Sequence, residues 1–599
     1  MLLGYNNRIA FVDLTSRSVS YLTPDEQLPR GVIGGRGLGA AFLQKHSRAK
    51  DPLSEESLLF AGVGPLTGSG FPLANRLTFV FWSPQTRTIA WANTGGYAGA
   101  ELKSSGLDAL VVTGRSEKPV FLLAENSELS IRDAASYWGR GAIESVVDLR
   151  HQLGDARVLS IGSAGENLVT FANVVNDGGR TSGVRHGVGC LMGSKLLKAI
   201  VIRGNPSRRL EVADRAAHIE SLKRMTAKIR GSPLLNHENG LLAVHGTPIA
   251  AEYLGRYDAL PVKNFSSTVL EGYLQVGGRS MSSSTLISRL TCTNCPVACR
   301  RETASSEKYH FRVEGPDFAQ ISSLGTNCGV LGLGAIGYLN QLCYEDGLDP
   351  IEMGNQMAVL AELRERLGVA DGPEWGDVDT MASLIRQTSK RQGVGEYLGL
   401  GPVGLSGHFG APELNMSVKR LSIQNTDPRV EQAWGLLNAT ENFGAGAHIW
   451  VYADLVYALR ESGVPTLVTP ESSPWEVAGM VKYKQDLVAV LDSLQVCAFS
   501  AYAFSVEDYA TELNNVTGST VDSEELLAIG DRINSIERRF NLEHGVTPAD
   551  DSLPQRFLDE PLPSGMHRGK VCDLGPMLTE YRKIRKESGS ASNGLPRLL

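Results

Sequence analysis

The chain has 599 residues, of which 42% are hydrophobic and 21% are charged, an ordinary globular composition that suggests about three or four domains. With 58 basic and 65 acidic residues the formal net charge is −7, which argues against nucleic acid or an anionic membrane as the main partner. No run approaches about 18 apolar residues, and the start of the chain lacks a basic segment followed by an apolar one, so we expect no membrane span, no signal peptide and a cytoplasmic location.

The first 208 residues contain short runs of β-branched and aromatic residues separated by glycine turns, a pattern typical of strands. Residues 141–153 instead repeat apolar side chains at helical spacing. We therefore predict a mostly β domain with one clear helix. Its strands are expected at residues 8–14 and 18–22, which form a hairpin, and at residues 77–82, 88–92, 110–112, 120–124, 158–161 and 199–202.

After residue 208 the spacing of apolar residues becomes that of helices. We predict helices at residues 213–230, 351–367, 378–392, 474–494 and 523–540. A change of character near residues 406–412 suggests a further boundary. The chain is therefore divided into a mostly β domain and two mainly helical domains, which makes the fold class α+β. Their predicted bounds are residues 1–208, 209–412 and 413–599.

Three cysteines, Cys292, Cys295 and Cys299, form a C-x2-C-x3-C motif. Three thiolates this close cannot all pair with one another, but they can ligate three different irons of one [4Fe–4S] cluster. The isolated Cys497 is the best candidate for the fourth ligand. A zinc site and buried free thiols are the alternatives, although zinc usually shows a second pair of ligands and none follows here.

The other four cysteines are isolated in the sequence, mostly among apolar or small residues. A thiol in such surroundings serves as a small buried hydrophobe. We expect that none of these four binds metal: Cys190, Cys328, Cys343 and Cys572.

Further landmarks run along nearly the whole chain in a fixed order. They are GYNNRIAFVDLT at the start, GPLTGSG, Arg76 within ANR, ANTGGYAGAELKSSGLDALVVTG, IGSAGENLV, NDGGRTSGVRHGVGCLMGSKLLKAI, CTNCPVAC, EGPDF, EDGLD, DPR, His448, the hexamer at residues 492–497 and ERRFNLEHG. In this order they resemble the aldehyde:ferredoxin oxidoreductase family.

The resemblance implies a β-sandwich-like base domain that carries two mainly helical domains, with the cofactors buried between them. It implies a tungsten or molybdenum bis-pterin centre, a Mg²⁺ ion that links the pterin phosphates, and a [4Fe–4S] cluster held by the four cysteines Cys292, Cys295, Cys299 and Cys497. Arg76 would lie between cluster and pterin, and the backbone oxygen of Asn93 would bind the Mg²⁺ ion.

Two glycine-rich stretches, residues 93–99 and 183–193, offer the backbone N–H groups and close approach that phosphates need. In the context of the family resemblance we assign Gly95 and Gly187 to cofactor binding, with Arg185 able to add a bidentate charge. A plain turn is the alternative for any single glycine-rich stretch.

Two similar hexamers, residues 344–349 and 492–497, match the pair that the family uses, one for each pterin. The resemblance implies that Asp349 and Asp492 accept hydrogen bonds from pterin N–H groups, and Val496 belongs to the second hexamer. Helix capping is the alternative role for either aspartate.

Several positions depart from the family pattern. Ala319 stands where the family's aldehyde oxidases usually have a glutamate near the metal, so a titratable group is missing. The active-site histidine is retained as His448, which we predict to act as the acid/base or substrate-orienting group, with a packed or surface histidine as the alternative. Trp450 replaces a common lysine, and Tyr344 replaces the usual aspartate of the first hexamer.

In some family members an iron ion bridges two subunits of a dimer. The ligands of this iron are the Glu and His side chains of an E-x-x-H pattern. The matching positions here are Tyr338 and Gln341, so we do not expect that iron. The oligomeric state stays open, with an oligomer among the options.

The function that the resemblance implies is the two-electron oxidation of an aldehyde to a carboxylic acid, with electrons passing through the cluster to ferredoxin or an iron–sulfur partner subunit. Ala319 and Trp450 favour one alternative, another reaction on the same cofactor, such as the reduction of an activated aromatic acid. A second alternative is a non-catalytic electron-transfer subunit, which would contain iron without tungsten or molybdenum.

Overall fold

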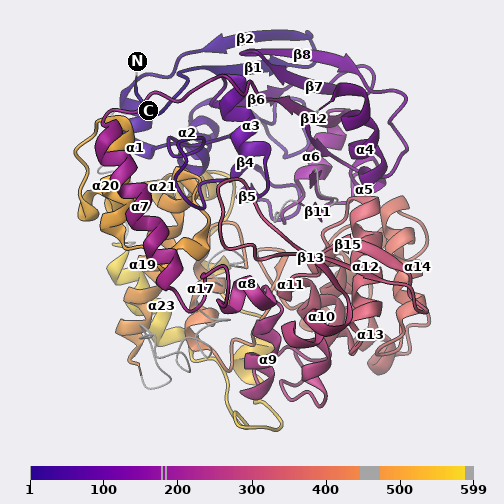
Figure 1. Ribbon diagram of the computed structural model, residues 1–599. Coiled ribbons are helices and arrows are strands. Elements are labelled where there is room, and N and C mark those ends of the chain that lie inside the picture. Colours follow the sequence, from indigo (N-terminus) through magenta and orange to yellow (C-terminus); the bar gives the residue numbers. More distant parts are fainter. Residues whose placement is uncertain (1, 155, 177–179, 182–184, 446–471, 587–599) are drawn as a thin grey trace.

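A six-stranded mixed sheet opens the chain, and it lies near the top of Figure 1 in the order β2-β1-β6-β3-β4-β5. Strands β1 and β6 pair in parallel and the other neighbours are antiparallel. The computed structural model describes residues 2–154, 156–176, 180–181, 185–445 and 472–586. The strands of this sheet are β1 (Ile9–Asp13), β2 (Ser18–Leu22), β3 (Leu59–Gly62), β4 (Leu77–Trp82), β5 (Ile89–Thr94) and β6 (Ala109–Thr113).

A second six-stranded sheet has the order β11-β10-β9-β12-β7-β8. Its alternating side chains pack into two different cores: Leu122 and Ile200 point into the main core, whereas Phe121 and Val201 join a smaller cluster with Val146. Its strands are β7 (Val120–Glu125), β8 (Glu128–Asp133), β9 (Arg157–Ser160), β10 (Val175–Asn176), β11 (Arg180–Thr181) and β12 (Leu197–Arg203). All eight predicted strands are present within two residues of their expected bounds, which confirms that part of the prediction.

Helices of the N-terminal part pack around the two large sheets. Helix α2 packs both against strands β3 and β4 and against the C-terminal helices α19 (Pro474–Leu494) and α21 (Ser523–Glu543). A Cβ atom at Gly39 would lie 2.5 Å from Cγ2 of Val80, so only glycine lets α2 pack this close to β4. The helices are α1 (Gln27–Val32), α2 (Gly35–His46), α3 (Ala98–Ser105), α4 (Ala142–Leu153), α5 (Ser163–Glu166) and α6 (Val188–Ser194).

The middle of the chain is mainly helical, but it also contains an antiparallel three-stranded sheet that the sequence analysis did not predict. The cysteine motif lies in the loop between its first two strands. The sheet consists of β13 (Leu286–Leu290), β14 (Arg300–Ser305) and β15 (Phe311–Glu314), and β16 (Ser417–Val418) and β17 (Leu421–Ser422) form a small ribbon. The helices are α7 (Arg215–Gly231), α8 (Leu241–His245), α9 (Ile249–Arg256), α10 (Gly278–Ser284), α11 (Phe318–Gln320), α12 (Leu333–Asp346), α13 (Pro350–Leu367), α14 (Val378–Lys390), α15 (Gly395–Leu398) and α16 (Pro402–His408).

The C-terminal part forms a group of helices at the left of Figure 1, below the first sheet. Helix α19 is the central one, since it packs against α2, α17, α21 and α23. The helices are α17 (Gln432–Thr440), α19 (Pro474–Leu494), α20 (Val506–Thr517), α21 (Ser523–Glu543), α22 (Gln555–Asp559) and α23 (Leu574–Ile584). The predicted helix bounds at residues 474–494 match α19.

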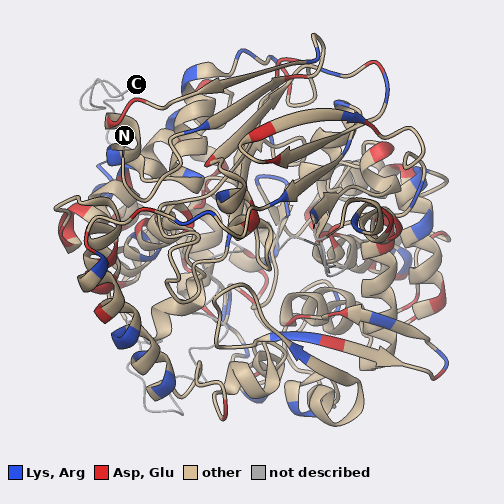
Figure 2. Ribbon diagram, turned by 45° about the horizontal axis from the view of Figure 1, so that its top comes forward, with Lys and Arg blue, Asp and Glu red and all other residues tan. Residues whose placement is uncertain are grey.

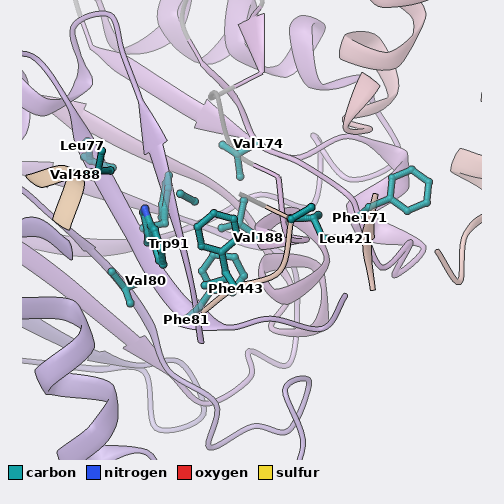
Figure 3. Packing of buried hydrophobic residues seen from close by; sticks show 14 of the residues in the cluster. Leu77, Val80, Phe81, Trp91, Phe171, Val174, Val188, Leu421, Phe443 and Val488 are labelled. Carbon is teal, nitrogen blue, oxygen red and sulfur yellow. The ribbon is translucent and has the colours of Figure 1, made fainter. Parts of the chain in front are cut away.

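The base sheets and the C-terminal part share one core. Figure 3 shows Trp91 of β5 beside Phe443, whose rings meet edge to face with centroids 4.2 Å apart. Helix α7 also packs against α20, where Lys228 and Asp508 form an ion pair of 2.5 Å. The division into three domains at residues 208 and 412 therefore stays a prediction.

Charged residues of both signs are spread over the outer helices, whereas the strands of the two large sheets are mostly uncharged (Figure 2). Among the described residues no helix combines the length and the apolar character that crossing a bilayer requires.

Candidate active site

The four cysteines Cys292, Cys295, Cys299 and Cys497 line one cavity. Three of them come from the loop between β13 and β14, and Cys497 follows the end of α19. The pKa of the Cys295 thiol is raised to about 12, first by burial and then by the neighbouring Cys292 and Cys497. The pKa of Cys299 is raised by burial and by the other three thiols. The fold therefore gathers four sulfur donors from two distant parts of the chain.

This donor set fits an iron–sulfur cubane. A cubane takes each thiolate on a different iron, so its ligands stand apart around the cluster, whereas a single ion needs all its ligands at one point. Within the residues that the structure describes, no three His, Cys, Asp or Glu side chains converge tightly enough to hold one metal ion.

A short segment at residues 73–76 connects the two groups of cysteines. The N–H of Leu73 donates to the carbonyl of Asn294 at 3.1 Å, and the N–H of Cys497 donates to the carbonyl of Leu73 at 3.0 Å. Ala74 and Val496 form an isolated antiparallel bridge. The backbone itself thus sets the position of Cys497 relative to the cysteine loop.

Arg76 joins this segment to the first glycine-rich stretch. Its Nη2 atom donates to Sγ of Cys497 at 2.9 Å. A Cβ atom at Gly95 would lie 3.0 Å from Nη1 of Arg76 and 3.2 Å from Sγ of Cys292. Glycine is therefore favoured at position 95 because the arginine and a cysteine approach its backbone closely.

Asn93 and Asp492 are joined by a buried hydrogen bond. Nδ2 of Asn93 donates to Oδ1 of Asp492 at 2.6 Å, while Thr78 donates to Oδ1 of Asn93 at 2.5 Å. Asp492 lies in the last turn of α19 and both residues line the cavity. Burial raises the pKa of Asp492 to about 6, against the lowering effect of Arg36.

Arg36 belongs to the site but was not predicted from the sequence. It is fully buried, its Nη1 atom lies 3.5 Å from Oδ2 of Asp492, and its guanidinium stacks 3.3 Å above the ring of Trp91. Nε and Nη2 each donate to Glu537 at 2.8 Å. No local sequence signal could have indicated this network, because its carboxylates lie more than 450 positions away on α19 and α21.

Arg185 is held by protein carboxylates. Its Nη2 donates to Glu352 at 2.6 Å, its Nε donates to Asp349 at 3.2 Å, and its Nη1 donates to the carbonyl of Ser422 at 2.9 Å. Asp349 also accepts from the N–H of Ile351 at 2.9 Å as the N-cap of α13. In this structure the capping alternative for Asp349 is thus realised, although burial raises the pKa of its carboxyl to about 6.

Gly187 is the N-cap residue just before helix α6 and has φ of +81°, and a Cβ atom there would lie 2.0 Å from the carbonyl oxygen of Thr170. A left-handed backbone and a close backbone neighbour both require glycine. Gly187, Gly95 and Asp349 are not in the wall of the cavity, whereas Arg76, Arg185 and Val496 are.

Three buried amides in the cavity wall have side-chain oxygens without a hydrogen-bond partner among the described residues: Asn75, Gln320 and Gln424. Buried acceptors are normally satisfied, so these oxygens fit a ligand that carries N–H donors, as a pterin ring does. None of the three was predicted from the sequence.

Two family models match nearly the whole chain: the one described as "Aldehyde ferredoxin oxidoreductase, N-terminal domain" matches residues 9–204, and the one described as "Aldehyde ferredoxin oxidoreductase, domains 2 & 3" matches residues 220–597. The chain belongs to the aldehyde ferredoxin oxidoreductase family. This confirms the family prediction.

The tungsten-containing aldehyde ferredoxin oxidoreductases of Pyrococcus furiosus and Thermococcus kodakarensis are both 37% identical to this chain over 595 residues, which cover 98% of this chain and 96% of each relative. A solved structure, the active site complex BamBC of benzoyl coenzyme A reductase with 1,5-dienoyl-CoA, superposes with a TM-score of 0.84 at 22% identity, covering 98% of this chain and 95% of that one. This likeness confirms the α+β fold class.

The departures from the family pattern occupy definite places in the structure. Ala319 lines the cavity, two residues after Asp317, whose Oδ1 accepts from Thr247 at 3.3 Å. Tyr344 is buried and packs with Phe311 and Val313, so a core side chain stands where the family usually has an aspartate.

The positions that match the E-x-x-H pattern serve contacts within the chain. The ring of Tyr338 stacks on that of Tyr309 with centroids 5.6 Å apart, and Gln341 donates to Glu345 at 2.8 Å. His448 and Trp450 lie outside the described residues.

Proposed function

We propose that this protein oxidises an aldehyde to a carboxylic acid at a tungsten- or molybdenum-bis-pterin centre and passes the electrons through a [4Fe–4S] cluster to ferredoxin or an iron–sulfur partner subunit. The observation that carries the proposal is the gathering of four cysteines on one cavity, with Arg76 between Cys497 and the first glycine-rich stretch. The names of the family relatives, which are tungsten-containing aldehyde ferredoxin oxidoreductases, support the reaction.

In this proposal Cys292, Cys295, Cys299 and Cys497 hold the cluster. Cysteines that bind metal must not be oxidised to disulfides, and a reducing compartment prevents that oxidation. This agrees with a cytoplasmic location. The guanidinium of Arg76 donates to the Cys497 sulfur, and an outer contact of this kind orients a metal ligand.

The pterin centre would be held by Arg76, Asn93, Gly95, Arg185, Gly187, Asp349, Asp492 and Val496. Among the described strands, β5 forms the edge of its sheet, so no other described strand pairs with the outer side of its backbone at Asn93. A backbone carbonyl that binds Mg²⁺ would need such an open side. Asn93 and Arg36 fix the Asp492 carboxylate from two sides, which holds its oxygens ready to accept from a ligand. The metal–pterin group supplies the two-electron chemistry when bound, and the protein supplies orientation and electrostatics.

His448 is proposed to hold or move the proton at the substrate, since the family places a histidine at this position. The cavity wall offers no carboxyl group at position 319 to share that task. His448→Ala is therefore expected to lower turnover at least about 10²-fold, because one general acid–base group is typically worth about 10²–10⁴ in rate. Full activity of the variant at unchanged metal content would remove His448 from the mechanism.

A second candidate is another reaction on the same cofactor, such as the reduction of an activated aromatic acid. Ala319 favours it, because position 319 of the cavity wall carries no carboxyl group, where the family's aldehyde oxidases usually have a glutamate. Turnover of a panel of aliphatic and aromatic aldehydes with a viologen dye as acceptor tests the main proposal. Activity with an aromatic acyl thioester and a low-potential donor, without aldehyde turnover, would favour the second candidate.

A further inference from the structure

The cysteine loop reaches the surface at one place. Asn294, between Cys292 and Cys295, is exposed, and Pro296 is half-buried, whereas Cys497 is buried. Electron transfer weakens steeply with distance, so electrons leave a buried centre most readily where the protein layer above it is thin. A partner that takes electrons is therefore expected near residues 294–296.

Basic residues are connected to this point by hydrogen bonds. Nδ1 of His237 donates to the carbonyl of Pro296 at 2.9 Å. Nη1 of Arg289 contacts the carbonyl of His237 at 3.3 Å, and the side chain of Asn236 donates to the carbonyl of Arg230. The end of α7, the loop after it and β13 thus form one continuous surface beside the cysteine loop.

The charge of this surface differs from that of the whole chain. The last 11 residues of α7, residues 221–231, contain four exposed basic residues and no acidic one: Lys223, Arg224, Lys228 and Arg230. Glu220 pairs with Lys223 and Asp508 pairs with Lys228, but Arg224, Arg230 and Arg289 have no ion-pair partner among the described residues. Glu238 is an exposed acid in the loop after α7. A local excess of basic side chains without an ion-pair partner among the described residues, on a chain of net charge −7, indicates an acidic partner.

An apolar side chain lies in the same area. Strand β13 is the edge of its sheet, and both Ile287 and Arg289 on this strand are exposed. Interfaces are enriched in arginine and place apolar side chains at their centre. We define the α7–β13 surface by these residues: Arg230, His237, Ile287, Arg289 and Asn294.

We propose that the α7–β13 surface docks a small acidic iron–sulfur protein, which takes electrons from the cluster at its exposed edge. The proposal rests on the proposed function of the four cysteines. Opposite charges on the two partners speed their encounter and set their orientation, and salt screens this attraction.

The test uses the holoenzyme, purified without oxygen, and a small acidic ferredoxin with two [4Fe–4S] clusters. The variant Arg230→Glu/Arg289→Glu is compared with Arg17→Glu/Arg132→Glu, which makes the same charge change in the turn after β1 and on β8, at the top of Figure 1 and away from β13. Affinity for the ferredoxin is measured by titration, and turnover is measured with ferredoxin and with viologen dye. Arg289→Gln serves as a milder variant if the reversal harms folding.

We expect the α7–β13 variant to bind ferredoxin about tenfold or more weakly at low salt, with a smaller difference at high salt, and to keep its iron content and its turnover with dye. Equal affinities of the two double variants would overturn the proposal. If neither the wild-type protein nor any variant oxidises an aldehyde with the dye as acceptor, the proposed function is contradicted. The titration would still test the docking surface, because it measures binding alone.

Discussion

Arg76 donates a hydrogen bond to the sulfur of Cys497 across 2.9 Å, and the two residues are 421 positions apart in the sequence. The same arginine approaches Gly95, whose absent side chain makes room for it. One side chain therefore contacts both the cysteine set and the first glycine-rich stretch.

The substitution Arg76→Lys tests this link. Lysine keeps the positive charge but lacks the planar guanidinium whose two nitrogens approach Cys497 and Gly95. We therefore expect the variant to retain its iron while its activity falls about 10–100-fold, which is the usual effect of losing a residue that supports a metal ligand. Turnover and the midpoint potential of the cluster are the measurements. Arg87→Lys, which alters an exposed ion pair with Asp51, is the control and should change neither. An Arg76→Lys protein with unchanged potential and turnover would contradict the role.

Cysteine substitutions test the fourth ligand. Cys497→Ser is expected to lower the iron content and to remove the paramagnetic signal of a reduced [4Fe–4S] cluster, because the structure brings this sulfur to the other three. Cys343→Ser is the matched control: this thiol is fully buried on α12 and outside the cavity wall, so its iron content should be unchanged. Iron loss in the Cys343 variant alone would show that the wrong ligand has been assigned.

Arg36→Met should destabilise the protein strongly. The change leaves Asp492 and Glu537 buried without their cation, and breaking a buried pair by removing one partner typically costs about 3–5 kcal/mol. The thermal melting temperature of the iron-loaded protein is the measurement. Arg539→Met removes an exposed pair with Glu543 on the same helix, α21, which is worth about 0.5 kcal/mol or less. Similar melting temperatures for both variants would mean that the network contributes little.

Glu441 makes stability depend on pH. The carboxyl group is buried, and burial raises its pKa to about 7 despite Arg36, while Glu537 acts in the same direction and Lys419 in the opposite one. Its pKa in the folded protein exceeds the value of about 4.3 in the unfolded chain. At a pH between these two pKa values the folded protein therefore keeps a proton that the unfolded chain has lost. Stability therefore falls by about 1.4 kcal/mol per pH unit as pH rises from about 4.5 to 7.

Glu441→Gln removes this penalty. The variant should melt at nearly the wild-type temperature near pH 4.5 and above it at pH 8, by the equivalent of about 3 kcal/mol. Glu543→Gln, an exposed glutamate whose pKa is lowered, is the control and should show no gain at pH 8. A difference between Glu441→Gln and wild type that is the same at every pH would refute the account.

The sequence predicted the strands and the long helices well, because alternating and helical apolar spacing determine which face of each element is buried. It predicted α19 to the residue, where a capping box at Ser473 and Glu476 marks the start. The three-stranded sheet β13–β15 was missed because its strands are short and carry many charged residues, so neither pattern is visible there.

The site could be predicted only where a local motif or the family resemblance marked it. Arg36, Asn75, Gln320 and Gln424 have no local signal, since a buried polar side chain is identified by its three-dimensional neighbours. A local motif can also suggest a different contact from the one that the fold makes. The position of Arg185 in a glycine-rich stretch suggested that its side chain contacts a phosphate, whereas in the structure it pairs with Asp349 and Glu352.

The central claim is that the cavity holds both an iron–sulfur cluster and a tungsten or molybdenum pterin centre. Elemental analysis of the protein purified without oxygen tests it most directly, since it reports metals and pterin phosphorus together. The account predicts about four iron atoms per chain, from one cubane on four cysteines, with one tungsten or molybdenum and with phosphorus from two pterins. Stoichiometric zinc in place of iron, or iron without tungsten or molybdenum, would contradict it.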